Sequence, residues 1–104
     1  MGVAPEPLRW LKAVEAALAT SGRRADFIRN ASRTAGALTA SINDDGVTCA
    51  TWDDLVAATG CSRRRVAEHV AWLRAAGWLH RQAQTPPRQT GYRLSRPDTP
   101  SKRS

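Results

Sequence analysis

Residues 61 to 79 constrain the fold of this chain more than any other stretch, because they have the pattern of an amphipathic helix with both ends marked. The stretch reads CSRRRVAEHVAWLRAAGWL. Its larger aliphatic residues recur at spacings of four and three, which places them on one stripe of a helix. They are Val66, Val70 and Leu73. Ser62 is a strong N-cap residue, and Gly77 is the residue type that ends helices in the left-handed conformation. The pattern predicts a helix over about residues 62 to 76 with this stripe buried.

The first turn of the predicted helix carries three consecutive arginines, at positions 63 to 65. The positive end of the helix dipole disfavours cations there, typically by about 0.3–1 kcal/mol. We therefore expect a polyanion to meet this end of the helix. The side opposite the apolar stripe is polar or small, and Arg65 and Trp72 flank it. Its members are Arg64, Glu68, Ala71 and Ala75.

Positive charge is concentrated in the second half of the chain. The whole sequence carries 16 Lys and Arg residues against 9 Asp and Glu, a formal net charge of +7. Residues 1–60 contain six basic and seven acidic side chains, whereas residues 61–104 contain ten basic and two acidic ones. Because the excess surrounds the arginine-rich helix, this distribution is typical of a nucleic-acid-binding surface.

Two longer helices are predicted in the first half. Leu8 to Thr20 has an apolar stripe without an assigned partner, so we expect it to mediate dimerisation or to cap the core, and we favour the dimer. The stripe consists of Leu8, Leu11, Val14 and Leu18, widened by Trp10 and Ala17. Asp26 to about Ser41 has apolar residues at spacings of three and four. Gly36 lies inside this second pattern, where glycine costs about 1 kcal/mol relative to alanine unless it lets another helix approach closely.

The middle of the chain predicts a turn at residues 43–46, then a very short strand and a short helix. Val47 to Cys49 is the strand. Thr51 and Asp54 resemble a capping box, which opens a helix from Trp52 to Thr59. Gly60 makes the tight turn into the arginine-rich helix. After that helix, residues 78–83 and 91–95 predict a hairpin with a polar tip at 84–90, in which Tyr92 and Leu94 share a face.

These elements together, from Asn43 to Leu94, resemble the winged helix-turn-helix family of DNA-binding proteins. The likeness is to its bacterial transcriptional regulators and plasmid or phage replication proteins. The matching residues are TWDDLVAATGCSRRRVAEHVAWLRAAGWL followed by TGYRL. The resemblance implies a mainly α fold with a small β-hairpin, a winged helix-turn-helix with an extra N-terminal helix. The expected division is 1–24 for the lead-in and extra helix, 25–95 for the winged helix and 96–104 for a disordered basic tail.

The resemblance also implies that the arginine-rich helix enters the major groove and that the hairpin touches the backbone or an adjacent groove. The implied base readers are Arg63, Arg64 and Glu68, with Arg65 and His69 beside them and Arg81 and Arg88 on the hairpin. Thr51 and Ser62, with nearby backbone N–H groups, suit phosphate binding at helix N-termini. Glu68 has two interpretations: it accepts a hydrogen bond from cytosine N4, or it pairs with Arg64 four residues earlier. Trp72 is expected to pack under the hairpin or against the first helix.

We therefore expect sequence-specific binding of double-stranded DNA, by a transcriptional regulator or a factor for replication or maintenance of a mobile element. A homodimer through the N-terminal helix fits this expectation. The alternative is a winged helix that acts as a protein–protein interaction module without intrinsic DNA specificity.

Other classes of function have little support in the sequence. Four residues could ligate a metal, but their spacings match no zinc motif, and nothing implies a nucleophilic Cys–His pair. The four candidate metal ligands are Cys49, Cys61, His69 and His80. We expect free thiols, solvated imidazoles, no cofactor, no small-molecule ligand and no enzymatic activity. The chain shows neither a membrane-spanning apolar run nor a secretory signal pattern. A bacterial cytoplasmic location near the nucleoid is expected.

Overall fold

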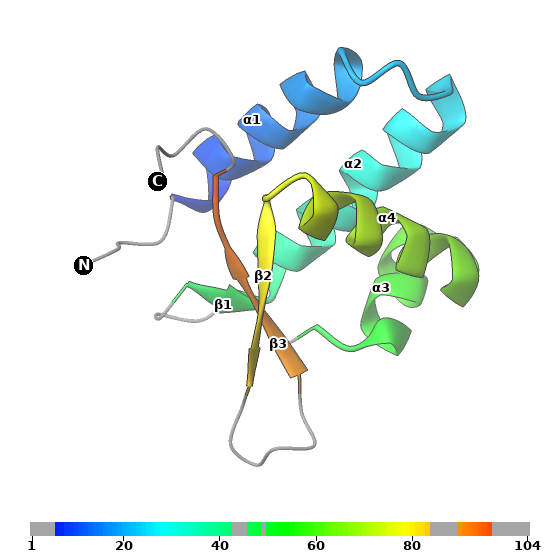
Figure 1. Cartoon of the computed structure of the whole chain (residues 1–104). Coiled ribbons are helices and arrows are strands. Elements are labelled where there is room, and N and C mark those ends of the chain that lie inside the picture. Colours follow the sequence, from blue (N-terminus) through cyan, green and yellow to red (C-terminus); the bar gives the residue numbers. More distant parts are fainter. Residues whose placement is uncertain (1–5, 43–45, 49, 84–89, 97–104) are drawn as a thin grey trace.

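Four helices in the described part of the chain form where the apolar spacing predicts them. The computed structural model describes residues 6–42, 46–48, 50–83 and 90–96. Its helices are α1 (Pro7–Ala19), α2 (Ala25–Ala40), α3 (Trp52–Thr59) and α4 (Arg63–Ala75) (Figure 1). Each begins and ends within one residue of the predicted position, so these four predictions are confirmed.

Capping side chains explain where the helices begin. The Glu6 carboxylate accepts backbone hydrogen bonds at the start of α1. Thr51 and Asp54 form the predicted capping box at the start of α3. The Ser62 hydroxyl accepts a hydrogen bond from the third residue of α4 at 3.2 Å, as expected of an N-cap. Between α3 and α4, Gly60 adopts a φ of 72°, a conformation that glycine reaches without steric cost. The local sequence therefore sets the tight turn that joins the two helices.

The strands form one antiparallel sheet of the order β1-β3-β2. Its members are β1 (Val47–Thr48), β2 (Leu79–Ala83) and β3 (Thr90–Leu94). Tyr92 and Leu94 are both buried, which confirms that they share the inner face of the hairpin. The short strand before α3 pairs with β3, and this pairing was not predicted because nothing local in the sequence specifies a partner for two residues.

Helix α1 is part of the core. Trp10, Val14 and Leu18 are fully buried, in one apolar cluster with residues of α2, α3, α4 and the sheet. The Trp10 indole N–H donates to the backbone carbonyls of Trp78 and Ser95, both at 3.0 Å, and so ties α1 to the base of the hairpin. Of the two roles predicted for this helix, packing on the core of the same chain is confirmed.

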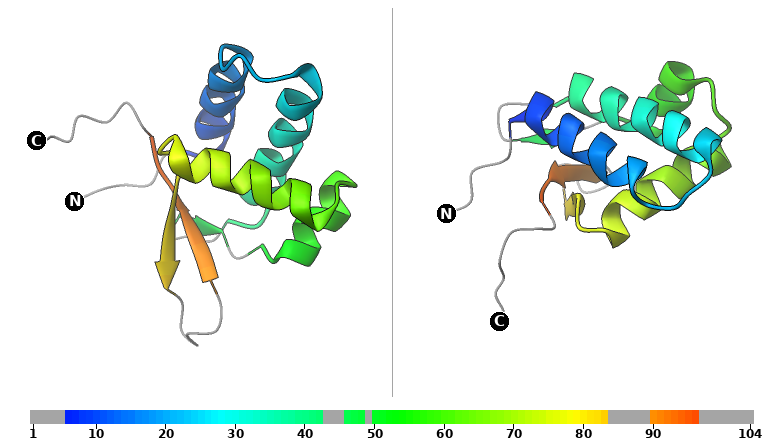
Figure 2. Two further views of the ribbon diagram at one scale, coloured as in Figure 1. Left: turned by 45° about the vertical axis from the view of Figure 1, so that its right-hand side comes forward. Right: turned by 90° about the horizontal axis from the view of Figure 1, so that it is seen from above.

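The dimer, which was the favoured role for this helix, is not tested by the structure. Leu8 is the member of the predicted stripe that lies outside the core, with 65% of its surface exposed. Seen from above, α1 and α2 lie side by side, and α4 and the hairpin lie to one side of them (Figure 2). The core therefore fills the space between this helix pair and the elements that carry the arginines.

Gly36 has open space around it. A Cβ atom placed there would meet nothing within 4 Å, so the interpretation of this glycine as a close-approach site for another helix is wrong. None of the helices in the described ranges is long and apolar enough to span a membrane.

Candidate nucleic-acid interface

Helix α4 has one buried side and one open side. Val66, Val70 and Leu73 are buried, as predicted from their spacing. The opposite side is exposed, and we call it the outer face of α4. It consists of Arg64, Ala67, Glu68, Ala71 and Ala75. The helix lies at the surface, with α3 beside its N-terminal end and the β2–β3 hairpin leading away from its C-terminal end (Figure 1).

The outer face has polar side chains at one end and small ones at the other. Arg64 and Glu68 lie in its first two turns, and three alanines make up the rest. A helix of 13 residues is about 20 Å long and, with side chains, about 10–12 Å wide, which matches the width of the DNA major groove. Because alanine is short, a partner can approach the helix closely beyond Glu68, where Ala71 and Ala75 lie.

Arg64 and Glu68 do not pair with each other in the part of the chain that the structure describes. The ion-pair interpretation of Glu68 is thus not realised in the free protein, and both side chains are available to a partner. Arg63 differs, since its guanidinium lies 3.8 Å from the carboxylate of Asp53 on α3. Both side chains are largely exposed, at 67% and 85%, so this ion pair contributes little to stability and can be exchanged for a phosphate.

The N-terminus of α3 does not suit a phosphate, contrary to the prediction for Thr51. The backbone N–H of Thr51 donates to the Asp54 carboxylate at 2.9 Å, and the backbone N–H of Asp54 donates to the Thr51 hydroxyl at 3.0 Å. These donors are already used, and the carboxylates of Asp53 and Asp54 repel an anion at this end. We therefore remove Thr51 from the candidate interface. Ser62 stays in it, because the first turn of α4 contains no acidic residue.

His69 does not belong to the exposed surface. It is 2% exposed, and its Nδ1 lies 2.8 Å from the Thr34 hydroxyl of α2. The Phe27 ring contacts it edge-on, at 5.3 Å between centroids. The predictions of a solvated imidazole and of a DNA contact at this residue are wrong, because α2 covers the side of α4 next to the apolar stripe.

The surroundings of His69 favour its neutral form. Burial lowers the pKa of the imidazole below its ordinary value of 6.5, and the nearby cations Arg65 and Arg23 lower it further. Glu68 acts in the opposite direction and raises this pKa. A neutral imidazole can donate from Nδ1 to the Thr34 hydroxyl, which in turn donates to the carbonyl of Asn30 at 3.2 Å.

Arg23 is a further cation on the α2 side of α4, where it acts on His69 together with Arg65. The Arg23 guanidinium stacks over the Phe27 ring at 3.9 Å from its centroid. Trp72 contacts the same ring edge-on at 6.4 Å, so it packs toward α2, which neither of its predicted positions included. Sequence reasoning missed Arg23 because it belongs to the half of the chain with little net charge. Only the packing of α2 against α4 brings it toward Arg65.

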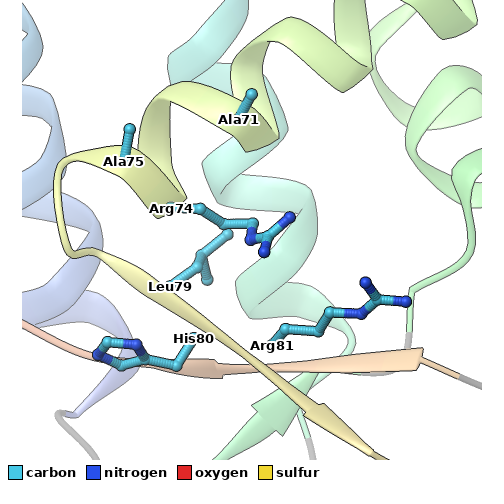
Figure 3. Close-up of a pocket in the computed structure, with 6 residues that line it drawn as sticks. All are labelled: Ala71, Arg74, Ala75, Leu79, His80 and Arg81. Carbon is cyan, nitrogen blue, oxygen red and sulfur yellow. The ribbon is translucent and has the colours of Figure 1, made fainter.

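A hollow of about 380 Å³ lies between the C-terminal half of α4 and β2 (Figure 3). It is lined by Ala71, Arg74, Ala75, Leu79, His80 and Arg81. Arg81 is exposed, as its predicted role requires, whereas Arg74 was not among the predicted site residues. A helix wheel would have placed Arg74 at the edge of the outer face. Arg88 lies outside the described residues.

The sequence also contains cysteines and histidines that were considered as metal ligands. Within them there is no group of three or more His, Cys, Asp or Glu side chains that could hold a metal ion. Cys61 is a partly buried free thiol, and Cys49 lies outside the described residues. His80 is exposed. Comparison with protein-family models, with curated proteins and with solved structures gave no match.

Proposed function

We propose that this protein binds specific double-stranded DNA as a winged helix-turn-helix, with α4 in the major groove. The observation that carries the proposal is helix α4, whose outer face is exposed and whose first turn carries three arginines and no acidic residue. The buried stripe on the other side of the helix holds this face in a fixed orientation. Cations at the positive end of a helix gain most when an anion approaches that end.

The two polar residues of the outer face have the chemistry of base readers. An arginine can donate two hydrogen bonds to guanine O6 and N7, and a glutamate can accept one from cytosine N4. Arg64 and Glu68 are one helical turn apart on the same face, so they would meet neighbouring base pairs. Arg63, Arg65 and Ser62 surround this pair and would contact phosphates, which fix the register of the helix on the duplex.

The β2–β3 hairpin would act as the wing, against the backbone or an adjacent groove, with the exposed Arg81 as one of its cations. Transcriptional regulation and replication or maintenance of a mobile element are the two roles that fit such a module, and either would place it at the nucleoid. The excess of basic over acidic side chains in residues 61–104 favours a polyanionic partner over the protein-interaction module.

Selection of bound duplexes from a random pool, at about 0.15 M salt, tests the proposal. An enriched sequence motif is the expected result, and a palindromic motif would support a dimer on DNA. Salt-sensitive binding without an enriched motif would contradict sequence specificity. Absence of binding to any duplex would contradict the whole proposal and favour a protein partner instead.

A further inference from the structure

The hollow beside α4 brings together two arginines from different elements. Arg74 lies in the last turn of α4, and Arg81 lies in the middle of β2. Their side chains extend in the same direction, whereas His80 points the other way (Figure 3). No acidic residue is among those that line the hollow. The result is an open, positively charged depression next to the outer face of α4.

We propose that this hollow holds the sugar–phosphate backbone of one DNA strand, with Arg74 and Arg81 as ligands of its phosphate oxygens. The inference rests on the proposed function and deepens it, since it assigns a binding role to Arg74. It also gives Arg81 a specific partner in the complex.

The helical geometry directs Arg74 toward a groove wall. Arg74 follows Arg64 by ten residues, which corresponds to a rise of about 15 Å and a rotation about 80° short of complete turns. If Arg64 points at the base edges, Arg74 therefore points sideways. The side walls of the major groove are the two phosphate backbones. The sideways direction is also the direction of β2, because Arg74 and the β2 residues line the same hollow.

The chemistry of the lining matches a phosphodiester. Two guanidinium groups can each donate forked hydrogen bonds to phosphate oxygens, a geometry that lysine does not offer. Ala71 and Ala75 line the α4 side of the hollow with methyl groups alone, so a sugar–phosphate chain can pass close to the helix. Leu79, which also lines the hollow, is 1% exposed and belongs to the apolar core beneath it. The hollow is open to solvent, so a free phosphate ion would stay hydrated there. A DNA strand already bound by α4, in contrast, presents its phosphates to the hollow at a high effective concentration.

Methylphosphonate substitution tests this assignment, because it neutralises one backbone phosphate at a time. The duplex is the one enriched by selection, and the protein is the full chain, either unchanged or carrying Arg74→Gln, Arg81→Gln or both. Arg33→Gln is the matched control. Arg33 is exposed on α2, so this substitution removes the same charge at a position away from the hollow. All of these positions are exposed, so each variant is expected to fold, which circular dichroism verifies.

At one or two adjacent phosphates, neutralisation should weaken binding of the unchanged protein by about tenfold, the loss of one charge-assisted contact. Arg74→Gln and Arg81→Gln should each reduce the sensitivity at those phosphates, the double variant should abolish it, and Arg33→Gln should leave it intact. Unchanged sensitivity in Arg74→Gln would overturn the inference. The inference would also be overturned if Arg74→Gln and Arg81→Gln changed the sensitivity at phosphates several nucleotides apart.

Two further outcomes separate this inference from the proposed function. If the unchanged protein binds no duplex, the proposed function fails and the hollow loses its ligand with it. If it binds a motif but inorganic phosphate alone, titrated by NMR, shifts the Ala71 and Ala75 amides at submillimolar concentration, the hollow is a site for a small anion. That result would overturn the backbone assignment and leave the proposed function standing.

Discussion

Arg64 is the residue that distinguishes base reading from simple attraction to DNA. It lies at the N-terminal end of the outer face of α4, and it forms no ion pair within the described part of the chain. A bidentate base contact typically carries about 1–3 kcal/mol of discrimination, whereas a phosphate contact weakens all sequences alike. Arg64→Ala should therefore lower affinity for the selected duplex and flatten the preference at one or two base pairs.

Binding series on the selected duplex and its single-base variants would measure this change. Arg33→Ala, which removes a charge from the exposed surface of α2, is the control and should keep the full preference profile. An unchanged profile in Arg64→Ala would show that another residue reads the bases.

His69 makes stability depend on pH. Because burial lowers its pKa in the folded protein, the unfolded chain, with a pKa near 6.5, binds the proton more readily. Stability is therefore complete above pH 6.5 and falls as the pH drops below it, by at most about 1.4 kcal/mol per pH unit. The decline ends below the lowered pKa of the folded state. Urea unfolding between pH 7.5 and 5 measures the slope, and His69→Gln should make it shallower. The same slope in both proteins would assign the effect to another group.

Thr48 carries a buried hydroxyl that finds no hydrogen-bond partner among the described residues. Leaving such a group unpaired costs about 1–3 kcal/mol, while a methyl group at the same place has no such requirement. Thr48→Val should thus raise the free energy of unfolding by about 1 kcal/mol. Chemical denaturation compares the two proteins, and a loss of stability would mean that the hydroxyl has a partner in solution.

At the scale of elements, the helices and strands were predictable to within about a residue because their signals are local. Capping residues, glycine turns and the spacing of apolar side chains all act over a few positions. What could not be predicted depends on contacts between distant segments: the pairing of β1 with β3, the choice between core and dimer for the α1 stripe, and the burial of His69. His69 is adjacent on the helix wheel to the apolar stripe, and only the position of α2 decides that it is covered. The exposure of Arg64 and Glu68 was predictable from the helix wheel, whereas the position of Arg23 and the hollow at Arg74 were not.

Helix α2 offers a test at this scale through Gly36. Its φ is not positive, and a Cβ atom would meet nothing within 4 Å, so alanine fits without strain. Gly36→Ala should stabilise the protein by about 0.5–1 kcal/mol, through helix propensity and a less flexible unfolded chain. Thermal unfolding measures it. A lower melting temperature would indicate that α2 needs its glycine for a contact the free chain does not make.

At the scale of the whole molecule, the described helices and the sheet share one apolar cluster, so α1 should unfold together with the rest. Trp10 connects distant parts of the chain, since its side chain is fully buried and its indole N–H donates to Trp78 and Ser95 at the base of the hairpin. Trp10→Phe keeps an aromatic ring but removes the indole N–H. The carbonyls of Trp78 and Ser95 then lose this hydrogen-bond donor.

We expect Trp10→Phe to destabilise the whole protein by about 1–3 kcal/mol, in a single cooperative transition seen by circular dichroism. Leu8→Ser is the matched control on the same helix, because Leu8 lies 65% exposed and outside the core. It should change the monomer's stability little. Sedimentation of the same two variants then bears on the dimer: if Leu8→Ser shifts a concentration-dependent association while Trp10→Phe does not, the exposed side of α1 is a dimer contact. If α1 instead unfolds in a separate, earlier transition, the shared core does not make the molecule one cooperative unit.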